Sequence, residues 1–206
     1  MEKRDFDQLA ANWDTPQRLR LAEDLLAAIS GEVALGPDLD VLDFGCGTGL
    51  LATALAPRVR SVVGVDASRG MLEVLQGKIA ASGLRHVRAL HREIDAQAPL
   101  PGPVHLAVSA MTLHHVPDPG PLLEAFHAVL HPGGHLALAD LDAEDGTFHG
   151  DNTGVFHFGF ERGALRDLFR AAGFQEVRHR TASEIVKPGR DGGTRRYPVF
   201  LMVGRK

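Results

Sequence analysis

The sequence predicts an α/β protein built on a mostly parallel sheet, with helices covering both faces. Two observations support this fold class. The first is that short apolar runs alternate with segments of helical periodicity along most of the chain. Strands joined through helices require right-handed crossovers, and such strands lie parallel to one another. The second is a glycine-rich stretch within residues 41–49, which is typical of a strand–turn–helix unit that binds a ligand.

Composition sets the broad class. The 206 residues suit one domain, residues 1–206, with 22 basic and 26 acidic residues and a formal net charge of −4. This balance disfavours a nucleic-acid partner. No apolar run reaches the roughly 18 residues that would span a bilayer, the N-terminus leads into no hydrophobic signal segment, and the single cysteine, Cys46, allows no internal disulfide. We therefore expect a cytoplasmic protein without membrane insertion. The histidines lack zinc-type spacing, so no metal is expected, and the oligomeric state cannot be read from the sequence.

The N-terminal segment, residues 1–31, is expected to be helical. Phe6, Leu9 and Trp13 are spaced for one helix face. Thr15 followed by Pro16 is typical of an N-cap and a first helical position, and the helical period that follows continues to residue 31.

The remaining elements alternate along the chain. Strands are expected at residues 41–44, 61–65, 87–91, 104–109, 136–141, 175–181 and 198–203, and helices at 50–56, 68–80, 122–130 and 163–172. A loop rich in Gly and Arg, residues 187–196, joins the last two strands without a helix. This connection allows an antiparallel pair at one end of the sheet.

The spacing of the glycines indicates the kind of ligand. Gly45, Gly47 and Gly49 occupy alternate positions, whereas a dinucleotide fingerprint would place its third glycine at residue 50, which is Leu50. Asp43, two residues before the loop, would repel a pyrophosphate and attract an ammonium or sulfonium group. A cationic nucleoside cofactor is therefore favoured, and a nucleotide-dependent oxidoreductase is the alternative.

Two more acids follow strands at the edge where an open α/β sheet binds its ligand. Asp66 ends the second strand and can accept ribose hydroxyls; the alternative role is a helix N-cap, which Ser68 can fill. Asp95 follows the third strand and can hydrogen-bond an adenine amino group while Ile94 or Ala96 packs on the ring. A solvated turn acid is the alternative for Asp95.

These motifs in this order resemble the class I S-adenosylmethionine-dependent methyltransferases. The stretches that carry the resemblance are residues 41–49, 63–66, 105–109, 113–119 and 130–135, together with Asp95. The chain most resembles the small-molecule branch (type 11) that includes quinone-biosynthesis C-methyltransferases, from about Phe6 to Gly204. The resemblance implies a Rossmann-like, seven-stranded, mostly parallel sheet whose last strand is antiparallel. It also implies methyl transfer from S-adenosylmethionine to a small-molecule acceptor, with a non-catalytic cofactor-binding regulatory module as a further alternative.

The resemblance also assigns cofactor contacts. The methionine part is expected against Gly45, Cys46, Gly47, Thr48 and Gly49, with Asp43 near its amino group. Asp66 takes the ribose, Ala67 and Met71 lie near the adenosine, and Ile94 and Asp95 meet the adenine. Ser109 and Ala110 approach the sulfonium. The N-terminal segment would fold over the cofactor, and Trp13 is either part of that lid or a core anchor.

A base is needed only if the acceptor must lose a proton. The candidates are His114, His115, Asp140, His149 and His157, for which packing or lid contacts are the alternative roles. Four phenylalanines at residues 148, 156, 158 and 160 interleave with two of these histidines. They form either the wall of an apolar or aromatic acceptor pocket or a surface loop held by its aromatic side chains.

Overall fold

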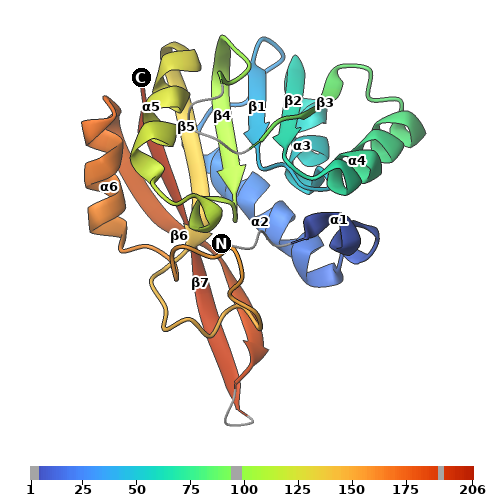
Figure 1. Ribbon diagram of the computed structural model, residues 1–206. Coiled ribbons are helices and arrows are strands. Elements are labelled where there is room, and N and C mark those ends of the chain that lie inside the picture. The colour runs from blue at the N-terminus through green and yellow to red at the C-terminus, as the bar shows by residue number, and fades with distance from the viewer. Residues whose placement is uncertain (1–4, 94–98, 190–192) are drawn as a thin grey trace.

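A single seven-stranded sheet forms the centre of the protein (Figure 1). The computed structural model describes residues 5–93, 99–189 and 193–206. The strand order is β3-β2-β1-β4-β5-β7-β6. The strands are β1 Asp40–Phe44, β2 Ser61–Asp66, β3 Val87–His91, β4 Val104–Ala110, β5 Leu130–Leu141, β6 Gln175–Pro188 and β7 Thr194–Arg205. β1 to β5 pair in parallel and β7 runs antiparallel to both of its neighbours, which confirms the predicted fold class.

Helices cover both faces of this sheet (Figure 1). They are α1 Phe6–Leu9, α2 Pro16–Glu32, α3 Leu50–Leu55, α4 Arg69–Ser82, α5 Pro119–Val129 and α6 Arg162–Ala171, with short 3₁₀ turns at Ala10–Asn12, Ala56–Arg58 and Leu113–His115. Side chains alternate between the two faces of a strand. Val41 of β1 accordingly packs in the core beneath α2 and α3, and Leu42 packs in the core beneath α5 and α6.

Helix boundaries follow local signals in the sequence. Thr15 caps α2 by accepting the N–H of Arg18, with Pro16 at the first helical position. Ser68 caps α4 in the same way, and Gly83, with a φ of +63°, ends it. Within the described residues, no helix combines the length and the apolar character that a bilayer crossing requires.

The end of the chain differs from the prediction. The expected loop at residues 187–196 is wrong, because β6 continues to Pro188 and β7 begins at Thr194. The cross-strand pairs continue as far as Pro188 and Thr194, and the hairpin extends beyond the rest of the sheet (Figure 1). Glycine and arginine are frequent in this part of the sequence, but antiparallel pairing includes residues 187–188 and 194–196 in the strands. The expected start of β5 at residue 136 is also late by six residues, since β5 begins at Leu130.

Candidate active site

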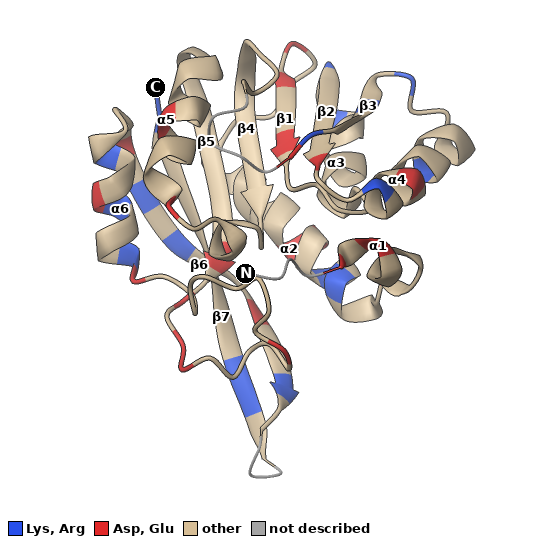
Figure 2. Ribbon diagram, in the orientation of Figure 1, with Lys and Arg blue, Asp and Glu red and all other residues tan. Residues whose placement is uncertain are grey.

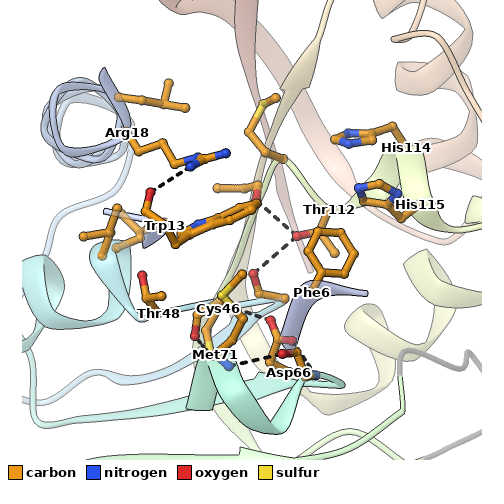
Figure 3. A pocket seen from close by; sticks show the side chains of 18 of the residues that line it. Phe6, Trp13, Arg18, Cys46, Thr48, Asp66, Met71, Thr112, His114 and His115 are labelled. Carbon is orange, nitrogen blue, oxygen red and sulfur yellow. Dashed lines mark hydrogen bonds between the residues drawn. The ribbon is translucent and has the colours of Figure 1, made fainter. Parts of the chain in front are cut away.

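A cavity of about 960 Å³ opens at the carboxyl ends of the parallel strands. Open α/β sheets bind their ligands at this edge. Its lining includes the following predicted cofactor residues: Trp13, Asp43, Gly45, Cys46, Gly47, Thr48, Asp66, Ala67, Met71 and Ala110. Side chains from the N-terminal segment face those that follow β1 and β2 across it (Figure 3).

The glycine-rich loop has a backbone conformation that residues other than glycine rarely adopt. Gly45, Gly47 and Gly49 have φ values of +70°, +53° and +77°, in the left-handed region that favours glycine. A Cβ at Gly45 would overlap the side chain of Thr112, and one at Gly49 would overlap Leu75. The loop therefore packs closely against Thr112 and Leu75. At Gly45 and Gly47, the backbone lines the cavity without a side chain over it.

Asp43 is a buried carboxylate at the end of β1 and lines the cavity, with an exposed fraction of 2%. Its Oδ2 has no hydrogen-bond partner among the described residues. Burial, together with the nearby charge of Asp66, raises the pKa of Asp43 to about 7. A cationic group in the cavity would compensate this carboxylate, so the site fits the amino group of S-adenosylmethionine.

Asp66 stabilises the glycine loop from the end of β2. Its Oδ2 accepts the N–H of Gly47 at 2.7 Å, and its Oδ1 accepts the N–H of Ser68 at 2.9 Å. Burial raises the pKa of this carboxyl as well. Since a carboxylate has about four acceptor sites, Asp66 keeps lone pairs for ligand hydroxyls. Ser68 fills the N-cap role that was the alternative for Asp66.

Residues 5–14, which we call the roof segment, cover the cavity and are held at two points. Asp7 accepts the Ser68 hydroxyl at 2.5 Å and the N–H of Gly70 at 2.9 Å. Asp14 accepts the Thr48 hydroxyl at 2.5 Å and pairs with Lys78 at 2.6 Å. The roof segment is thus bound directly to the loops that follow β1 and β2.

Trp13 belongs to this roof and lines the cavity. The guanidinium of Arg18 lies 3.7 Å from the centre of its ring and donates to its backbone carbonyl at 2.8 Å (Figure 3). The ring of Phe6 meets the indole edge to face, with 5.9 Å between ring centres. This position agrees with the lid role and not with a core anchor.

A buried histidine–carboxylate pair borders the cavity after β4. The Nδ1 of His114 lies 2.8 Å from Asp140 Oδ1, and its backbone N–H donates to Oδ2 at 3.1 Å. A carboxylate only accepts, so a neutral imidazole donates here from Nδ1 and has its acceptor at Nε2. The rings of His115 and His149, which also line the cavity, lie 4.2 Å and 5.0 Å from the His114 ring, centre to centre.

Several predicted site residues lie away from the cavity lining. Ser109 donates its hydroxyl to the carbonyl of Phe44 at 3.0 Å, and His157 Nε2 lies 3.0 Å from the carbonyl of Val116. Gly49 packs against Leu75. Asp140 is fully buried and contacts His114 without lining the cavity. Ile94 and Asp95 lie outside the described residues. Of the four phenylalanines, Phe148 and Phe156 line the cavity.

Sequence reasoning did not propose several polar residues that line the cavity, among them Arg18, Thr112 and Lys187. For Arg18 a signal existed, because it lies on the same helical face as Ala22 and Leu25, which also line the cavity. Lys187 gave no such signal, since its position depends on the unexpected length of β6.

Comparison with known proteins identifies the family. A family model described as a methyltransferase domain matches residues 15–180, and the chain therefore belongs to this family. The chain is an S-adenosylmethionine-dependent methyltransferase, as the sequence motifs indicated. The match favours this class over a nucleotide-dependent oxidoreductase or a regulatory module.

Two curated relatives have similar sequences. The ubiquinone biosynthesis O-methyltransferase of Leptothrix cholodnii is 30% identical over 158 residues, which cover 69% of this chain and 63% of that protein. An uncharacterised methyltransferase of Schizosaccharomyces pombe is 30% identical over 149 residues, which cover 65% of this chain and 52% of that protein. The chain thus matches between half and two thirds of the length of these relatives.

Solved structures share the fold. An S-adenosylmethionine-dependent methyltransferase from Aquifex aeolicus superposes with a TM-score of 0.67 at 23% identity, covering 95% of this chain and 97% of that chain. The phosphoethanolamine N-methyltransferase 2 of Haemonchus contortus, solved with S-adenosyl-L-methionine, gives a TM-score of 0.71 at 16% identity, covering 89% of this chain and 52% of that chain.

Proposed function

We propose that this protein transfers the methyl group of S-adenosylmethionine to a small-molecule acceptor. The observation that carries the proposal is the pair of buried acids at the glycine loop. Asp43 has an oxygen without a partner in the described chain, and Asp66 supports the backbone of Gly47 while keeping acceptor capacity. A ligand with one ammonium group and two neighbouring hydroxyls matches both acids.

Different residues of the site bind different parts of the cofactor. Asp43 pairs with the amino group, the backbone at Gly45 and Gly47 lies against the methionine part, and Asp66 accepts the ribose hydroxyls. Arg18, fixed over Trp13 by a hydrogen bond and ring contact, pairs with the methionine carboxylate. Ala67 and Met71 pack against the adenosine. When bound, the cofactor supplies a methyl group made electrophilic by its sulfonium.

His114 is the base when the acceptor is a hydroxyl. Its Nε2 would take the hydroxyl proton, and the bound cofactor would supply the methyl group that replaces this proton on the oxygen. Asp140 acts as a positioning residue, because it fixes the ring and stabilises the imidazolium. The buried His114–Asp140 hydrogen bond supports this assignment.

Calorimetric titration with S-adenosylhomocysteine tests the proposal. We expect Asp66→Ala to weaken binding by about 10- to 100-fold, the scale of lost charge-assisted hydrogen bonds. Asp38→Ala, an exposed acid at the opposite end of β1, serves as the matched control and should bind like the wild type. Release of S-adenosylhomocysteine across a panel of small acceptors then tests turnover. A wild-type protein that does not bind S-adenosylhomocysteine would exclude the proposal.

The cytoplasmic location, the lack of a nucleic-acid partner and the single domain stay predictions from composition and pattern. Salt-dependent retention on immobilised nucleic acid would contradict the second of them.

A further inference from the structure

We infer that the acceptor carries an anionic group on an aromatic or apolar body, and the structure assigns Lys187 to bind that group. The inference rests on the proposed function and adds the chemical class of the acceptor. The family model's match ends at residue 180, so nothing in the family assignment speaks of Lys187.

Charge is divided along the cavity. The acids in its described lining come from the roof segment and from the ends of β1, β2 and β3: Asp5, Asp7, Asp43, Asp66 and Glu93. Lys187 lies on β6, at the opposite edge of the sheet from β3. Figure 2 shows acidic residues at the ends of β1 and β2 and basic residues on the β6–β7 hairpin. A cofactor with a cationic centre suits the acidic end, and an anion suits the end at Lys187.

Lys187 faces the cavity because of the strand period. Ile185 and Lys187 are two residues apart on β6 and both line the cavity, whereas Val186 between them is 41% exposed. Arg195 and Arg196, at the start of β7, pair with Asp145 and Glu184, and neither of them lines the cavity. Lys187 therefore has a different position from the cations beside it.

The surrounding contacts fix the ammonium in place. Lys187 Nζ donates to the carbonyl of Phe148 at 2.6 Å and lies 3.5 Å from the centre of the Phe148 ring. The ring of Tyr197 packs on Phe148, and its hydroxyl lies 2.9 Å from that of Thr147. Gln17 of α2 donates to the carbonyl of Val186 at 3.0 Å. A cation held this firmly loses little freedom when it binds an anion.

A series of ring contacts connects Lys187 with His114. The Phe148 ring lies 4.8 Å from that of His149, which lies 5.0 Å from that of His114. These contacts connect the Lys187 ammonium to the His114 imidazole through the rings of Phe148 and His149, all of which line the cavity. Phe148 and Phe156 supply apolar surface beside this path. An aromatic acid can therefore contact Lys187 through its carboxylate and His114 through its reacting hydroxyl.

Paired probes test the inference. Protein saturated with S-adenosylhomocysteine is titrated calorimetrically with 2-naphthoate and with its neutral analogue 2-naphthamide. We expect the carboxylate to bind at least about tenfold more tightly, which corresponds to about 1.4 kcal/mol. Lys187→Met should remove this preference and Lys187→Arg should keep it. Lys206→Met, which removes a cation at the amino end of β5, is the control and should keep it too.

Each outcome decides between explanations. Equal affinity for the two probes, or no binding of either, overturns the inference, and this comparison needs only the wild-type protein. Equal weakening of both probes by Lys187→Met would mean that Lys187 only supports Phe148, and this also overturns it. The saturating titration with S-adenosylhomocysteine comes first, so a failure of the proposed function is recognised separately.

Discussion

Asp43 shows how one side chain can favour ligand binding at the expense of stability. Its carboxyl is buried, and its pKa is raised to about 7, first by burial and then by Asp66. Between about pH 4 and 7 the folded protein therefore holds a proton that the unfolded chain has released. The free energy of unfolding falls as the pH rises through this window, because the carboxyl must ionise in a buried position.

Replacing Asp43 with Asn should separate these two effects. We expect Asp43→Asn to raise the free energy of unfolding of the ligand-free protein at pH 7.5 by on the order of 1–3 kcal/mol, and by less at pH 5. The same change should weaken S-adenosylhomocysteine binding at pH 7.5, because the ammonium loses its partner. Thermal denaturation and calorimetric titration at both pH values measure this, with Asp38→Asn as the control. A variant that is less stable at both pH values would contradict the argument.

His114 allows a test that separates catalysis from binding. His114→Gln should lower kcat about 10²- to 10⁴-fold, the usual contribution of a general base, and leave the affinity for S-adenosylhomocysteine unchanged. His179→Gln changes an exposed histidine on β6 and should behave like the wild type. An unchanged kcat in His114→Gln would mean that the histidine only packs.

Among the elements, the roof segment and helix α4 are in unusually close contact. A Cβ at Gly70 would lie 2.9 Å from the backbone oxygen of Asp7 and 3.0 Å from its Cα. The roof could not keep its position over such a side chain. In the same helix, a Cβ at Gly77 would meet nothing within 4 Å.

This pair of glycines gives matched variants. Gly70→Ala and Gly77→Ala both gain helix propensity, about 1 kcal/mol each, so their difference isolates the contact with the roof. We expect S-adenosylhomocysteine to leave Gly70→Ala about tenfold faster than Gly77→Ala, since overpacking costs about 1–3 kcal/mol. Trp13, the single tryptophan of the chain, lines the cavity, so stopped-flow fluorescence measures the rate. Identical rates for the two variants would mean that the roof does not retain the ligand.

The elements also show what a sequence can predict. The order of strands and helices, the positions of β1 to β4, the cap at Thr15 and the glycine loop were predicted correctly, because each depends on residues a few positions apart. The long hairpin was not, because it depends on pairing between β6 and β7. The pair formed by Asp14 and Thr48 joins residues 34 positions apart, and His114 and Asp140 meet only because β4 and β5 are neighbours. Local patterns do not encode such contacts.

At the scale of the whole molecule, the division of charge follows from the order of the strands. β2 and β3 lie toward one edge of the sheet and β7 and β6 toward the other. The glycine loop and its acids therefore belong to one half, and the hairpin with Lys187 belongs to the other. The parallel strands β1 and β2 thus carry the region for a cationic ligand, and the antiparallel β6–β7 hairpin carries the region for an anionic one.

Asp43 Oδ2, which has no hydrogen-bond partner in the part of the chain that the structure describes, affects how long the protein persists in a cell. A chain without its methyl donor carries the cost of that buried charge, and a chain with the donor bound does not. Empty molecules would unfold more often and would be digested first by proteases. We therefore expect the abundance of this protein to follow the supply of its own donor.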